Sequence, residues 1–140
     1  MAETILYEKQ GNIVTMTLNR PDSLHAINRL LRKELADAIV EFDNDPEAVV
    51  AVITGSGRAF CSGRDLKERA DDNAQGIQAR ASASMTKETP FMWPRTWKPM
   101  IAAVNGFALA GGWSIAQMCD LRIASEEAKL GISETRWSLL

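Results

Sequence analysis

The sequence predicts an α/β fold, because segments of strand type and helix type alternate along the chain. Two continuous apolar runs, 49–54 and 101–104, have the composition of strands that are covered on both faces. The residues between 26 and 43 instead place their apolar side chains at helical spacing. A strand, a helix and a further strand in this order favour a right-handed crossover and a partly parallel sheet.

Residues 5–19 have the pattern of a β-hairpin. ILYEKQ and IVTMTLN alternate in polarity and are separated by Gly11 and Asn12, a turn pair of hairpin type. Turn-forming residues follow at 19–23. The next segment predicts a helix from about 26 to 43, which Pro46 ends.

After the first helix the sequence contains a weakly patterned stretch, a further strand and two glycine-bearing turns, the second of which begins a helix. Residues 70–89 are rich in Ala, Ser, Asp and Gln, and we interpret them as a mobile helix or loop. The apolar run 101–104 leads into Asn105-Gly106. Gly111 and Gly112 then begin a helix that continues through Cys119.

Composition predicts a single globular domain over residues 1–140. Hydrophobic residues make up 46% of the chain and charged residues 24%, which is ordinary for a globular protein. The 16 basic and 18 acidic residues are interspersed and give a net charge of −2. Such a chain has no extended field to attract nucleic acid or an anionic membrane, so we expect neither as a partner.

Few residues could bind a metal, and no targeting segment is recognisable. Cys61, Cys119 and the single histidine, His25, lack the spacing of a zinc site, so we expect no metal. The N-terminus carries acidic residues without an apolar core, and no stretch reaches membrane-spanning length. We therefore expect a cytoplasmic, reducing location.

Two segments share one design, in which a buried strand is followed by a glycine-bearing turn and a helix. They span 49–67 and 101–120. Glycine lets a ligand approach the backbone, and the first amides of a helix have no partner within it. If both turns face one cleft, two N–H groups can converge on one oxygen, as stabilising a thioester enolate requires.

Four segments resemble the crotonase (enoyl-CoA hydratase/isomerase) superfamily. AFCSGRDLKE and KPMIAAVNGFALAGGWSIAQMCDLRIAS are similar to its two signature segments, LNRPDSLHAIN to its first turn, and AKLGISE to the strand before a catalytic glutamate. The resemblance spans nearly the whole chain and about the first half of a usual family member. It implies repeated ββα units that form the N-terminal core, without the family's C-terminal helices.

The resemblance also implies an oxyanion hole. In the matching positions the backbone amides of Arg64 and Gly111 would form the hole, and Gly63 and Gly112 would shape the two turns. Arg64 would act through its backbone and not through its side chain.

Further residues match the segments that bind coenzyme A in the family. Asp65, Leu66 and Lys67 correspond to the stretch along the adenine and pantetheine; Lys67 is either a phosphate contact or a solvated helix residue. His25 is either an ordinary surface turn residue or packs on the coenzyme A side. Trp93 and Trp97 either line an acyl pocket or simply pack, and we interpret Cys119 and Asp120 as structural.

The carboxylates depart from those of the hydratases. In that group a glutamate follows two positions after the Gly-Gly turn, where this chain has Ser114, whereas the second glutamate is matched by Glu134. Serine is a poor general base at neutral pH, while one carboxylate in an apolar site can move a proton between two carbons. Without the resemblance, Glu134 would equally well be an acid placed for a helix dipole.

The resemblance implies an acyl-CoA enzyme of the enoyl-CoA hydratase/isomerase type, a lyase or isomerase of fatty acid metabolism. Coenzyme A would enter as part of the substrate, and no other cofactor is expected. By the same resemblance we expect a homo-oligomer, either a trimer or a hexamer. The alternatives are a non-catalytic module for acyl-CoA binding or assembly, and an inactive fragment of the family.

Overall fold

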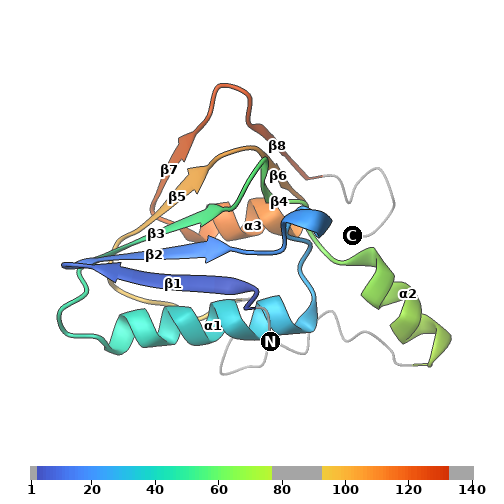
Figure 1. Cartoon of the computed structure of the whole chain (residues 1–140), viewed down its shortest axis with the longest axis horizontal. Coiled ribbons are helices and arrows are strands. Elements are labelled where there is room, and N and C mark those ends of the chain that lie inside the picture. Colours follow the sequence, from blue (N-terminus) through green and yellow to red (C-terminus); the bar gives the residue numbers. More distant parts are fainter. Residues whose placement is uncertain (1–2, 77–92, 133–140) are drawn as a thin grey trace.

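In the part of the chain that the structure describes, a mixed sheet, a smaller parallel sheet and three α-helices make up the fold, in agreement with the α/β prediction (Figure 1). The computed structural model describes residues 3–76 and 93–132. The larger sheet has the order β1-β2-β3-β5-β7, with β1 (Ile5–Gln10), β2 (Ile13–Leu18), β3 (Val50–Gly55), β5 (Met100–Val104) and β7 (Leu121–Ala124). The smaller has the order β4-β6-β8, with β4 (Ala59–Cys61), β6 (Phe107–Leu109) and β8 (Lys129–Gly131).

Successive strands alternate between the two sheets, which confirms the predicted repeated ββα units. Each of β3, β5 and β7 adds a parallel strand to the larger sheet, and the strand after it adds one to the smaller sheet. The helices that follow β4 and β6 are α2 (Leu66–Ala74) and α3 (Gly111–Met118). The turn between each strand pair and its helix therefore recurs at one end of the smaller sheet.

The predicted hairpin is confirmed as β1 and β2, which pair antiparallel around Gly11. The first helix, α1 (Arg29–Asn44), begins later than predicted. Ile27 is not helical, because its N–H and C=O are used in a parallel bridge with the segment around Arg64. The side chain of Asn28 instead caps the helix by accepting from the Leu31 amide at 2.8 Å.

The strand β4 lies so close to neighbouring backbone that three glycines are required beside it. A β-carbon on Gly55 would lie 2.2 Å from the Ala59 oxygen, and one on Gly106 would lie 2.1 Å from the Arg58 oxygen. On Gly112 it would lie 2.1 Å from the Cys61 oxygen. Since these contacts are with backbone, side chains at the glycines are excluded unless the strand moves.

The strands β4, β6 and β7 were not predicted, whereas β8 lies within the segment AKLGISE that was expected to be a strand. Three residues are too few for an alternating pattern to appear. All four residues of β7 are exposed, so no apolar face marks it in the sequence.

The weakly patterned stretch at 70–89 begins inside a helix. α2 includes residues up to Ala74 and extends away from the larger sheet in Figure 1. The rest of the predicted mobile segment, from 77, lies outside the described residues.

One hydrophobic cluster joins α1 and α3 to the sheets. Buried side chains from both helices and from the strands of the larger sheet meet in it, including Met16, Leu35, Phe42, Ile53 and Ile115. Trp93 belongs to this cluster, with 6% of its surface exposed. The cluster fixes the framework on which the two glycine-bearing turns are held.

Candidate functional site

The two glycine-bearing turns of the sequence lie side by side. A β-carbon on Gly63 would lie 2.9 Å from the β-carbon of Ala110 and 3.4 Å from the Gly111 nitrogen. A β-carbon on Gly111 would lie 3.9 Å from the Arg64 nitrogen. Residues that are far apart in the sequence thus bring two backbone amides into one place.

The direction of the Arg64 amide is set by its neighbours. The Ile27 amide donates to the Gly63 oxygen at 2.7 Å, and the Asp65 amide donates to the Ile27 oxygen at 3.0 Å. In an extended segment the N–H groups of successive residues point to opposite sides. The Arg64 N–H therefore points away from Ile27.

The second amide stands at the start of α3. Ala110, which precedes this helix, has φ 53° and ψ −122°, a conformation that side-chain-bearing residues rarely adopt. Its own amide donates to the Gly131 oxygen at 2.8 Å, which fixes the turn to β8. Gly111 is then the first helical residue, and such an amide has no partner within its helix.

Both amides are available for an acceptor from outside. Within the described part of the chain, neither the Arg64 N–H nor the Gly111 N–H donates a hydrogen bond. Buried or half-buried N–H groups are normally paired. Two adjacent amides of this kind, one of them at a helix N-terminus, favour a partly negative oxygen.

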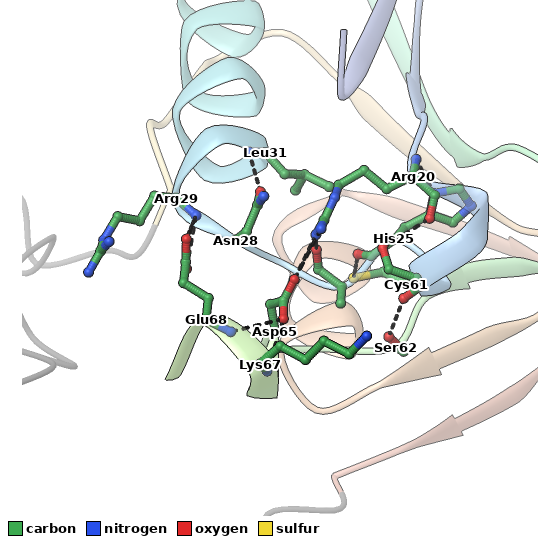
Figure 2. A network of polar contacts seen from close by, with 12 residues as sticks. Arg20, His25, Asn28, Arg29, Leu31, Cys61, Ser62, Asp65, Lys67 and Glu68 are labelled. Atoms are coloured by element: carbon green, nitrogen blue, oxygen red, sulfur yellow. Dashed lines mark hydrogen bonds and ion pairs between the residues drawn. The ribbon is translucent and has the colours of Figure 1, made fainter. Parts of the chain in front are cut away.

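An ion pair that the sequence did not predict joins Arg20 to Asp65 beside the bridge between Ile27 and Arg64. Both terminal nitrogens of Arg20 donate to Oδ2 of Asp65 at 3.1 Å, and Arg20 also donates to the Ala26 oxygen (Figure 2). Oδ1 of Asp65 caps α2 by accepting from the amides of Lys67 and Glu68. Both carboxylate oxygens are therefore engaged within the protein.

Burial and hydrogen bonding oppose each other at Asp65. Burial acts to raise the pKa of its carboxyl, but the Glu68 amide and the Arg20 guanidinium outweigh it and hold this pKa below its ordinary value. Asp65 is therefore ionised at neutral pH. If Asp65 contacts coenzyme A as predicted, it does so either with other atoms or with a carboxylate oxygen that already accepts hydrogen bonds within the protein.

His25 is not the surface residue that a lone turn histidine suggests. Only 1% of it is exposed, and it lies in a turn in which both Leu24 and His25 adopt positive φ. Its Nδ1 accepts from the Arg20 amide at 2.9 Å, so Nε2 carries the proton and donates to the Ser56 oxygen at 2.7 Å. Burial lowers the pKa of His25 and favours this neutral form.

The remaining predicted residues fall in different places. Leu66 and Lys67 are exposed on α2, and Ser114 is half-buried one turn after Gly111. Glu134 lies outside the described residues. Trp97 is fully exposed and Trp93 is in the core, so neither is seen to line a pocket among the described residues.

The structural interpretation of Cys119 and Asp120 is supported. The Cys119 thiol donates to the Ile115 oxygen at 3.5 Å, and Asp120 accepts from the Met100 amide at 2.8 Å. Burial raises the pKa of Cys119 to about 12 and that of Cys61 to about 11, so both remain thiols.

The described residues offer neither a metal-binding cluster nor a membrane-spanning helix. No group of three or more His, Cys, Asp or Glu residues that could hold a metal was found in 3–76 and 93–132. No helix there is long and apolar enough to cross a membrane.

Comparison with known proteins gives one consistent result. The sequence profile described as "Enoyl-CoA hydratase/isomerase" matches residues 8–139. A probable enoyl-CoA hydratase of Mycobacterium bovis is 42% identical over 99% of this chain and 52% of its own length. A short-chain-enoyl-CoA hydratase of Clostridium acetobutylicum is 39% identical over 93% of this chain and 49% of its own length.

Solved structures agree with the sequence comparison. The crystal structure of a probable enoyl-CoA hydratase/isomerase from Mycobacterium abscessus superposes with a TM-score of 0.83 at 38% identity. The match covers 100% of this chain and 52% of that one. The chain thus spans about half the length of the relatives it matches.

Proposed function

Because the chain belongs to the enoyl-CoA hydratase/isomerase family, we propose that it binds acyl-CoA thioesters with the thioester oxygen between the amides of Arg64 and Gly111. The observation that carries this proposal is the proximity of the two turns, each with an amide that has no acceptor in the described residues. Hydrogen bonds aimed at an oxygen where negative charge develops stabilise an enolate.

Glu134 would supply the proton transfer in this proposal. A single carboxylate can remove a proton from one carbon and return it to another, which suits double-bond isomerisation. Hydration is easier to explain with a second group that orients and deprotonates water. Coenzyme A enters as part of the substrate, with no separate cofactor. A cytoplasmic location and a homo-oligomeric assembly belong to the same proposal.

A second candidate function rests on Ser114. Where the hydratases have a glutamate, this half-buried serine offers no base at neutral pH. A module that binds acyl-CoA without converting it would need the two amides but not a second carboxylate. Binding and turnover must therefore be tested separately.

Binding is tested with a pair of ligands that differ only at the carbonyl group. We expect a 2-enoyl-CoA thioester to shift the NMR signals of the Arg64 and Gly111 amides together, because both donate to its oxygen. The corresponding S-alkyl-CoA thioether, which lacks that oxygen, should leave both signals near their free positions. The Gly11 amide, in the hairpin turn between β1 and β2, serves as the control. Shifts that are equal for the two ligands would rule out the proposed oxyanion hole.

Turnover is tested by replacing the two candidate residues separately. Glu134→Gln should still bind the thioester but lose activity towards 2-enoyl- and 3-enoyl-CoA, because the amide cannot accept the proton; loss of one general base costs on the order of 10²- to 10⁴-fold. Ser114→Ala should change the rate only modestly. Full activity in Glu134→Gln together with none in Ser114→Ala would contradict the one-carboxylate mechanism. Binding without any wild-type turnover would favour the non-catalytic module.

A further inference from the structure

The segment that positions the Arg64 amide has little regular structure of its own. Between β2 and α1 the chain forms a short 3-10 turn, η1 (Pro21–Ser23), and then two residues with positive φ, Leu24 and His25. Ile27 follows, and its two backbone bonds hold the residues on either side of Arg64. Backbone hydrogen bonds among residues 20–26 order part of this segment, and side chains add to them.

The Arg20 side chain adds a link between the two ends of the segment. Its guanidinium donates to the Ala26 oxygen, one residue before the bridge at Ile27. It also donates twice to Oδ2 of Asp65, one residue after Arg64. The guanidinium thus spans the two strands of the bridge and contacts both beside the residue whose amide is free.

Asp65 connects this arrangement to α2. With one oxygen on Arg20 and the other on the amides of Lys67 and Glu68, the carboxylate fixes the direction in which the chain leaves Arg64. The side chains of Arg20 and Asp65 are 22% and 13% exposed. Charge-assisted hydrogen bonds that are shielded from water to this degree define geometry better than exposed pairs do.

We propose that Arg20 and Asp65 are positioning residues that aim the Arg64 amide at the thioester oxygen, an inference that rests on the proposed function. They act through the backbone of residues 26–27 and 64–65 and contact no reacting atom. Without the pair the bridge at Ile27 would persist in part, but the Arg64 N–H would sample several directions. An oriented donor loses much of its effect when it is displaced by about 1 Å.

The test compares affinities for the enoyl-CoA thioester and the S-alkyl-CoA thioether. The ratio of the two dissociation constants isolates the contribution of the carbonyl oxygen, because any change in contacts to the coenzyme A part affects both ligands equally. We expect Arg20→Ala to lower the wild-type preference for the thioester by about three- to tenfold, the effect of one lost neutral hydrogen bond. A loss of folded protein lowers the amount of binding but leaves this ratio unchanged.

Conservative variants separate positioning from stability. Asp65→Asn retains an oxygen for the cap of α2 while removing the charge that holds Arg20, so it should lower the ratio even if Arg20→Ala does not fold. Arg20→Lys keeps the charge and should restore part of the preference. Lys33→Ala removes an exposed ion pair with Asp37 on α1 and should leave the ratio at the wild-type value.

The outcomes distinguish this inference from the function on which it rests. A wild-type ratio near one would overturn the proposed oxyanion hole itself. A wild-type preference that persists unchanged in Asp65→Asn and in folded Arg20→Ala would overturn only the positioning role. A reduced ratio in both variants, with Lys33→Ala unchanged, would support it.

Discussion

At the scale of single residues, the buried imidazole of His25 links the fold to pH. Its neutral ring joins the Arg20 amide to the Ser56 oxygen, and burial lowers its pKa. Protonation would remove the acceptor at Nδ1 and place a second positive charge near Arg20. The neutral form is therefore the one that the folded state selects.

We predict that the stability of the fold decreases as pH falls below about 6.5, the ordinary pKa of histidine in an unfolded chain. The unfolded chain then binds a proton before the folded chain does, so unfolding becomes easier until the pH passes the lower folded pKa. Above about 6.5 this contribution is constant. Denaturant unfolding at a series of pH values measures the effect.

The chain is well suited to this measurement because His25 is its single histidine. NMR titration of the imidazole should give a midpoint below 6.5, and His25→Gln should abolish the slope of stability between pH 7 and 5.5. A midpoint at or above 6.5 would contradict the interpretation. Carboxyl groups with ordinary pKa values near 4 contribute mainly at lower pH.

Sequence reasoning located the residues with free amides but not the side chains that hold them. Glycines at 63 and 111 stand out because of their place between strand and helix. Arg20 resembles any arginine in a turn until the fold brings Asp65 beside it. The positive φ of Leu24 and His25, which makes this turn depend on its contacts, is likewise not visible in the sequence.

At the scale of elements, β4 is defined by contact and not by pattern. It has three residues, all of them buried, and its neighbours on several sides are glycines. A sequence of this length carries no period, whereas α1, with sixteen residues and a capping asparagine, was predicted to within a few residues. A long element whose contacts are mostly local is therefore easier to predict from the sequence than a short one held by distant residues.

We predict that Gly106→Ala destabilises the protein by about 1–3 kcal/mol or more, the usual cost of forcing extra volume into packed surroundings. Its β-carbon would lie 2.1 Å from the Arg58 oxygen and 3.1 Å from the Ala59 α-carbon, and backbone cannot rotate away as a side chain can. Chemical denaturation measures the difference in the free energy of unfolding.

A matched substitution is available at Gly131. Among the described residues, a β-carbon there meets only the Leu109 Cδ2 atom, at 3.9 Å, which is ordinary contact. Gly131→Ala should therefore change the free energy of unfolding by no more than about 0.5 kcal/mol. Equal losses in the two variants would show that glycine is needed at these positions for a reason other than the close approach to β4.

At the scale of the whole molecule, the division into two sheets was the part least accessible to sequence reasoning. The class and the repeated units were predicted, because buried strands and helices leave strong patterns and the family's signature segments are specific. Which strand joins which sheet depends on pairs between distant residues, such as Ala59 with Phe107 and Phe107 with Lys129. No local pattern encodes these pairs.

Among the described residues, the side chains of β7, one of the two edge strands of the larger sheet, are exposed. In β7 the side chains of Leu121 and Ile123 are 60% and 67% exposed. The relatives that the chain matches are about twice as long. An apolar edge strand of this kind is a surface on which further β structure or a covering helix could pack.

The alternation of strands between the sheets also determines the order in which the molecule can assemble. The hairpin of β1 and β2 closes locally, but β4 has no partner until β6 has been made, and β6 receives its second partner only from β8. Pairs that close long loops form late, because the entropy lost on closure precedes any gain from contact. The meeting of Gly63 with Gly111 depends on these pairs, so we expect the two amides to converge after the hairpin has formed.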